Sequence, residues 1–243
     1  MADDPSSSPV QAAALQDALT PLARLALAYA PAKCRNDWLT VLALDARLAA
    51  VLRQSREPVL GQIRLAWWRE KLEALSAGNP PAEPLLARIA MLGGGVEARE
   101  GLISLVNGWE SLLGESSLNQ EVFNQFANGR AQAMVWLAVR HGADPAKAAD
   151  LARRWALADL ALHLGDPAER EVVQVLWQAL PPPSGSAGRV LRPLAILEAV
   201  SARALARSDP AALTSPAALG IALRIGLLGR SAAVLTAQIR RIR

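Results

Sequence analysis

Residues 56–72 read REPVLGQIRLAWWREKL and form the most distinctive segment of the chain. Its apolar side chains recur at helical spacing in two neighbouring stripes: Leu60, Ile63 and Trp67, and beside them Trp68, Leu72 and Leu75. The pattern predicts a helix that is buried over a wide arc. Packing in a helical core is the expected role of Trp67 and Trp68, and lining an apolar ligand cavity is the alternative.

The same helical period dominates the rest of the chain. The 243 residues are 52% hydrophobic but only 4% aromatic, so Ala and Leu must make up most of the core. No run of alternating β-branched residues predicts a strand. We therefore expect an all-α, single-domain helical bundle. The expected helices lie near residues 11–30, 32–54, 58–77, 84–92, 96–114, 118–141, 145–164, 168–180, 190–208 and 216–243.

Local signals mark where helices begin and where the chain leaves them. Five junctions place a proline directly after a side chain that can cap a helix: Thr20-Pro21, Asp144-Pro145, Asp166-Pro167, Asp209-Pro210 and Ser215-Pro216. Residues 1–9 predict a disordered tail, which leaves residues 10–243 for the domain. Residues 181–188, rich in Pro, Gly and Ser, predict a mobile loop or a domain linker.

The charge is unevenly distributed along the chain. The net charge of +4 divides into −3 for residues 1–187 and +7 for residues 188–243. Such an excess suggests an anionic partner, either a lipid surface or a nucleic acid. Nucleic acid is disfavoured because every aromatic residue precedes residue 178, which leaves the basic end without side chains on which bases could stack. No uncharged apolar run is long enough to cross a bilayer, so we expect a cytoplasmic protein that is soluble or peripheral on the inner face of the membrane.

The last expected helix carries an apolar seam, a line of residues spaced alternately four and three apart: Ile221, Ile225, Leu228, Ala232, Leu235, Ile239 and Ile242. Such a seam most often packs against a neighbouring helix. No acid follows Asp209, and Arg230, Arg240 and Arg241 lie away from the seam. The alternative is that these three arginines contact anionic lipid while the helix rests on a membrane.

Together with residues 38–51, which read WLTVLALDARLAAV, the segment at 56–72 resembles the squalene/phytoene synthase family. Members of that family are all-helical isoprenoid synthases with a large central cavity. The resemblance is closest to a divergent branch that includes a mitochondrial complex I assembly factor. In the order of its elements it extends from about residue 20 to 230, and its specific part covers residues 38–75. It implies a bundle of the isoprenoid synthase type with a central cavity.

The resemblance also implies where a metal site would lie. Active members hold Mg²⁺ between two aspartate-rich segments that face each other across the cavity, because a dication bridging a diphosphate needs several carboxylate oxygens. The first segment should lie near residues 49–53, where this chain has Ala49 and Arg53 and no acid. The second offers Asp159 and His163, four residues apart on one helical face. We expect His163 to interact with the dipole at the end of its helix, and we expect no metal.

The family's architecture assigns candidate roles to the remaining residues. The candidate lining of the cavity is Asp45, Ala49, Arg53, Trp67, Trp68, Asp159 and His163. Guanidinium groups can clamp a diphosphate in place of Mg²⁺, and the candidates are Arg47, Arg53, Arg56 and Arg64. Solvated helix faces carry arginines of this kind as well.

These expectations lead to one principal functional hypothesis. The chain is expected to be a non-catalytic member of the family, without a cofactor, that binds an isoprenoid, another lipid or a partner protein in an assembly or accessory role. An anionic membrane surface is a further expected partner, and nucleic acid is not. The alternative is an active prenyltransferase that joins two prenyl diphosphates and uses Mg²⁺. A helical interaction module unrelated to the family is the third hypothesis.

Overall fold

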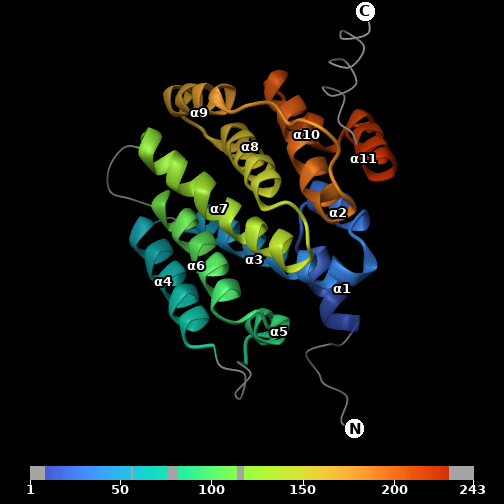
Figure 1. The fold of residues 1–243 in the computed structure, drawn as a ribbon. Coiled ribbons are helices and arrows are strands. Elements are labelled where there is room, and N and C mark those ends of the chain that lie inside the picture. The colour runs from blue at the N-terminus through green and yellow to red at the C-terminus, as the bar shows by residue number, and fades with distance from the viewer. Residues whose placement is uncertain (1–8, 56, 76–81, 114–117, 230–243) are drawn as a thin grey trace, which may run out of the picture.

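The computed structural model describes residues 9–55, 57–75, 82–113 and 118–229. In these residues the chain is a single all-α domain without strands, as expected (Figure 1). Its α-helices are α1 (Pro9–Asp17), α2 (Pro21–Ala28), α3 (Ala32–Gln54), α4 (Pro58–Glu73), α5 (Pro84–Leu92), α6 (Gly95–Ser111), α7 (Gln120–Arg140), α8 (Pro145–His163), α9 (Pro167–Ala179), α10 (Arg192–Ala206) and α11 (Pro216–Leu228). Two short 3₁₀ helices, η2 (Arg189–Leu191) and η3 (Pro210–Thr214), flank α10.

The long helix α3 organises the N-terminal half of the fold. It contacts α1, α2, α4, α5, α6 and α7, and α7 crosses in front of it in Figure 1. α8 packs between α7 and α10, and α10 carries α11 on its far side. The buried indole of Trp38 on α3 donates a hydrogen bond to the Val190 carbonyl oxygen in η2 at 3.1 Å. This bond ties the centre of the fold to a segment about 150 residues further along the chain.

Two glycines allow α6 and α7 to approach closely. A Cβ atom on Gly129 would lie 2.4 Å from the Ser104 carbonyl oxygen and 2.7 Å from the Gly108 Cα atom. A Cβ atom essentially never lies within 3.0 Å of another non-bonded heavy atom, so any side chain here would push the two helices apart. The absence of a side chain at Gly108 and Gly129 therefore fixes where α7 sits against the bundle.

The capping signals in the sequence are confirmed at all five junctions. Thr20, Asp144, Asp166, Asp209 and Ser215 each accept a hydrogen bond from a backbone N–H in the turn that follows. The cap at Thr20 also corrects one expectation. The helix expected over residues 11–30 is two helices, because Thr20 has an extended backbone and its hydroxyl caps the start of α2.

The expectation of one continuous helix over residues 216–243 is wrong. α11 ends at Leu228 because Gly229 adopts a left-handed backbone with φ of 68°. The backbone N–H of Ala187 donates to the Gly229 carbonyl oxygen at 2.7 Å, which holds this end against the loop before η2. The expected seam also fails within α11, since Ile225 is buried but Leu228 is exposed. The continuation of the seam, Ala232, Leu235, Ile239 and Ile242, lies outside the described residues.

The expectation that α4 is buried over a wide arc is also wrong. The stripe of Trp68 and Leu72 is buried, together with Leu65. The stripe of Leu60, Ile63 and Trp67 is exposed, and Ile63 keeps 61% of its surface accessible. α4 is an outer helix whose extensive contacts are with α3 and α6. These two helices cover only one of its faces.

The loop at residues 181–188 lies within the domain and is held to it. The Lys147 ammonium donates to the carbonyl oxygens of Ser184 and Ser186 at 2.9 and 2.6 Å. Because α8 and α10 on either side of this loop pack against each other, it does not separate two domains. The expected tail at residues 1–9 lies outside the described residues except for Pro9, the first residue of α1. Among the described helices, none combines the length and the apolar character needed to span a membrane.

The two faces of α4 predict opposite responses to truncation. Leu65→Ala should lower the free energy of unfolding by about 2–5 kcal/mol, because Leu65 is fully buried. Ile63→Ala should change it by no more than about 0.5 kcal/mol, because Ile63 is exposed. Urea titrations of both variants and the wild type measure the difference. A cost at Ile63 as large as that at Leu65 would mean that the outer face is covered in solution.

Candidate functional site

The centre of the bundle holds a buried arginine paired with an aspartate. Arg130 projects from α7 and is 2% exposed, and Asp45 projects from α3 and is 6% exposed. The Arg130 guanidinium donates from Nε to Asp45 Oδ1 at 3.0 Å and from Nη2 to Oδ2 at 2.6 Å. This paired geometry matches the fork of a guanidinium to both oxygens of one carboxylate, the strongest form of this contact.

A second carboxylate reaches the same guanidinium from α8. Arg130 Nη1 donates to Asp159 Oδ2 at 2.9 Å. Asp45 and Asp159, both candidates for the cavity lining, are therefore brought together, and Arg130 bridges them. The His163 side chain lies in the last turn of α8, where its Nδ1 is 2.7 Å from the Asp159 carbonyl oxygen. His163 therefore lies in the last turn of its helix as expected, and its interaction with the helix dipole stays a prediction.

Aromatic rings close the space around Arg130. The guanidinium carbon lies 3.8 Å from the centroid of the Trp155 ring, and 5.3 and 5.4 Å from those of Trp109 and Phe126. The Trp109 indole also donates a hydrogen bond to Asp45 Oδ1 at 2.8 Å. The rings supply cation–π contacts and exclude water, so the charges at the centre interact at low dielectric.

The electrostatics of this cluster keep the Arg130 guanidinium positively charged. Burial alone lowers the pKa of Arg130, but the carboxylates of Asp45 and Asp159 outweigh that effect and hold the pKa above its ordinary value. Asp45 already accepts three hydrogen bonds, two from Arg130 and one from Trp109. The cluster therefore has the properties of a permanent internal ion pair. Within it, Asp45 is fully engaged, whereas Asp159 accepts from Arg130 at Oδ2 and keeps 26% of its side chain exposed.

The other cavity candidates do not join this cluster. Ala49 is buried one helical turn after Asp45, and Arg53 is exposed near the end of α3. Trp68 packs in the core, whereas Trp67 keeps 39% of its surface accessible and meets Trp68 edge to face. None of the seven candidates lines any of the main surface pockets of the described residues, which lie elsewhere on the fold.

The candidate diphosphate clamps lie on the surface. Arg47 and Arg64 are exposed, and Arg47 faces Glu83 at 3.8 Å. Arg56 lies outside the described residues, as do the membrane-contact candidates Arg230, Arg240 and Arg241. Within the part of the chain that the structure describes, no three His, Cys, Asp or Glu side chains gather where they could hold one metal ion.

A second buried ion pair lies between α8 and α10. Arg154 Nε donates to Glu198 Oε1 at 2.9 Å, and its Nη1 donates to the Leu180 carbonyl oxygen at 3.0 Å. The Arg154 guanidinium also stacks over the Trp177 ring at 4.4 Å. Burial raises the pKa of the Glu198 carboxyl, and the neighbouring Arg154 offsets only part of that shift.

Sequence reasoning missed Arg130, Arg154 and Glu198, although the sequence carries a signal for the first. Arg130 occupies one position in a line of buried apolar residues along α7, namely Phe123, Phe126, Met134 and Leu137. A charge in such a line must be buried, and a buried arginine requires a carboxylate partner. The sequence could not show which of the acids on other helices supplies it.

Comparisons with protein-family models, with curated proteins and with solved structures find no match for this chain. The resemblance at residues 38–75 thus stays a prediction from sequence, and the geometry described above has to carry the functional argument.

The central cluster predicts a large loss of stability when the arginine is removed. Arg130→Met should lower the free energy of unfolding by about 3–5 kcal/mol, because it leaves the Asp45 carboxylate buried without its cation. Arg153→Met on α8 is the matched control, since Arg153 donates only to the neutral Asn128 side chain and should cost less than about 1 kcal/mol. Chemical unfolding of both variants gives the comparison.

Neutralising the partner should rescue part of that loss. Asp45→Asn combined with Arg130→Met buries no lone charge at this contact, so the double variant should be more stable than Arg130→Met alone. A double variant that is less stable than the single one would show that the charge of Asp45 is satisfied by other groups.

Proposed function

We propose that the chain is a divergent, non-catalytic member of the squalene/phytoene synthase family that works by binding, in an assembly or accessory role. The all-α architecture agrees with that family, and the resemblance at residues 38–75 supports the assignment. In this proposal the chain keeps the helical architecture of an isoprenoid synthase, but buried side chains fill the space between α3, α7 and α8 where the family's cavity would lie.

The observation that carries the proposal is the bridge of Arg130 between Asp45 and Asp159. The two carboxylates come from α3 and α8, the helices on which the resemblance places the two metal-binding segments. A guanidinium held by the chain itself now pairs with both and balances one of their two negative charges. A dication at this position would have to approach the positive charge of Arg130 and displace its hydrogen bonds, so the residues present do not fit Mg²⁺. Without a metal, the pyrophosphate of a prenyl substrate lacks the charge compensation that its departure requires.

Exposed apolar surface supports a role in binding. Val59, Leu60, Ile63 and Trp67 form an uncovered apolar face along α4. Contiguous apolar surface of this kind is typical of contact sites with proteins or membranes. A partner protein, as the accessory role requires, would find on this face an aromatic anchor in Trp67.

A second apolar face, on α11, suits an anionic membrane. Leu219, Leu223 and Leu227 are spaced four apart and are exposed. From residue 210 to 243 the chain has five arginines and no acid, so this end attracts anionic head groups while the leucines enter the interfacial region. We place the protein in the cytoplasm, peripheral on the inner face of a membrane.

The absence of prenyl transfer can be tested directly. Incubation with farnesyl or geranylgeranyl diphosphate and Mg²⁺ should release no pyrophosphate above a heat-denatured control. Millimolar Mg²⁺ should also leave the midpoint of thermal unfolding unchanged, because a ligand stabilises only a fold that binds it. Turnover, or a Mg²⁺-dependent shift that Asp159→Asn abolishes, would overturn the proposal in favour of an active prenyltransferase.

The membrane contact predicts selective flotation with lipid vesicles. The wild type should float with phosphatidylglycerol vesicles and remain in solution with phosphatidylcholine vesicles. Leu219→Glu combined with Leu223→Glu should lose flotation, because it places acids on the α11 face. Ile63→Glu, at an exposed apolar position on α4, is the control and should float like the wild type. Equal flotation of all three proteins would place the membrane contact elsewhere.

A further inference from the structure

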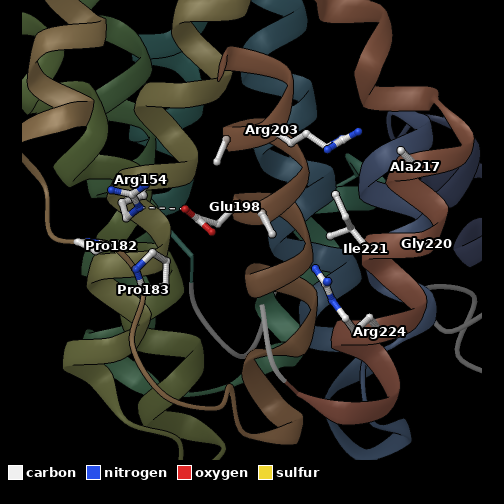
Figure 2. A pocket seen from close by; sticks show the side chains of 11 residues that line it. Arg154, Pro182, Pro183, Glu198, Arg203, Ala217, Gly220, Ile221 and Arg224 are labelled. Atoms are coloured by element: carbon white, nitrogen blue, oxygen red, sulfur yellow. Dashed lines mark hydrogen bonds and ion pairs between the residues drawn. The ribbon is translucent and has the colours of Figure 1, made fainter. Parts of the chain in front are cut away.

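A pocket of about 440 Å³ lies between α10, α11 and the start of the loop at residues 181–188 (Figure 2). The ion pair of Arg154 and Glu198, already described, lines one side of it. Its apolar wall comes from Pro182, Pro183 and Ile221 and from small residues of α10 and α11. The volume lies within the range of pockets that bind small molecules, about 300–1,000 Å³.

Two further arginines enter this pocket from opposite sides. Arg203 extends from α10 toward α11, and Arg224 extends from α11 toward α10, with Ile221 between them (Figure 2). Both are half-buried, and the Nε atom of each is buried without a hydrogen-bond partner among the described residues. Within the same residues, no carboxylate lies within 4.0 Å of either guanidinium.

This arrangement differs from the other buried arginines of the fold. Arg130 and Arg154 each have a carboxylate partner, as buried charges require. Glu198, the acid of the pocket, is occupied by Arg154. The pocket therefore has a net formal charge of +2 from its three arginines and one glutamate, and two guanidinium groups with donors to spare.

We infer that this pocket binds a phosphomonoester that carries a short aliphatic group. A phosphate presents three terminal oxygens in different directions and so can accept from guanidinium groups on two opposite walls. A carboxylate presents two oxygens in one plane and fits a single guanidinium better. The apolar wall of Ile221, Pro182 and Pro183 lies beside the charged groups, and it accommodates the aliphatic part.

The pocket is separate from the central cluster, so the inference depends neither on family membership nor on the loss of catalysis. The same phosphomonoester chemistry occurs in soluble metabolites and in the head group of phosphatidic acid. The test therefore has one arm for each source.

Titration calorimetry with hexyl phosphate tests the pocket on the full chain. The wild type should bind hexyl phosphate at least about tenfold more tightly than inorganic phosphate, because the hexyl chain buries apolar surface. It should also bind hexyl phosphate more tightly than hexanoate. Arg203→Gln and Arg224→Gln should each weaken hexyl phosphate binding about tenfold, the usual effect of losing a charge-assisted hydrogen bond.

Two further variants test whether hexyl phosphate binds in the pocket or is attracted only by the positive charge of this region. Arg207→Gln removes an exposed arginine just after α10 that does not line the pocket, and it should leave the affinity unchanged. Ala202→Leu keeps both arginines but fills part of the pocket, so it should weaken hexyl phosphate more than inorganic phosphate. Circular dichroism confirms that each variant is folded.

The second arm identifies the source of the phosphate. Competition for hexyl phosphate by phosphatidic acid vesicles, but not by phosphatidylglycerol vesicles of equal charge, would assign the pocket to a lipid head group. Saturable hexyl phosphate binding without such competition would assign it to a soluble phosphomonoester. Either outcome supports the pocket. No saturable binding to the wild type, or the same affinity in Arg203→Gln, Arg224→Gln and Arg207→Gln, would overturn the inference.

Discussion

A buried guanidinium must have partners, and this requirement organises the centre of the fold. Arg130 lies between Asp45 and Asp159, and the rings of Trp109, Phe126 and Trp155 lie around its guanidinium. Arg130 and Asp45 are buried, whereas the Asp159 side chain keeps 26% of its surface accessible. Four helices, α3, α6, α7 and α8, have to be in register for these contacts to form together. The cluster thus specifies one packing of the bundle among the many that an Ala- and Leu-rich core would tolerate.

The position of Arg130 depends in turn on how closely α6 and α7 approach. Gly108 and Gly129 let the two backbones meet, and Gly129 directly precedes Arg130 in the chain. A wider spacing would carry the guanidinium away from Asp45, because its fork contacts both oxygens of that carboxylate at hydrogen-bond distance. The two glycines and the buried arginine therefore depend on each other, because the close helix approach positions the guanidinium.

The sequence predicted most of the fold and little of the site. Helix starts could be predicted because a cap and a proline act through their nearest neighbours, as at Asp144 and Ser215. The exposed face of α4 could not be predicted. The spacing of apolar residues shows where they line up on a helix, but it does not show which line another helix covers. The resemblance indicated Asp45 and Asp159 only as candidates for the lining of one cavity. It gave no indication of Arg130, whose pairing depends on contacts 29 and 85 residues apart in the chain.

The two uncovered apolar faces lie on different sides of the molecule. α4 and α11 stand at opposite edges of the bundle in Figure 1, with α3, α7 and α10 between them. A partner protein bound to the exposed apolar face of α4 would therefore leave the exposed leucines of α11 accessible. The partner contact proposed for α4 and the membrane contact proposed for α11 therefore do not compete for the same surface.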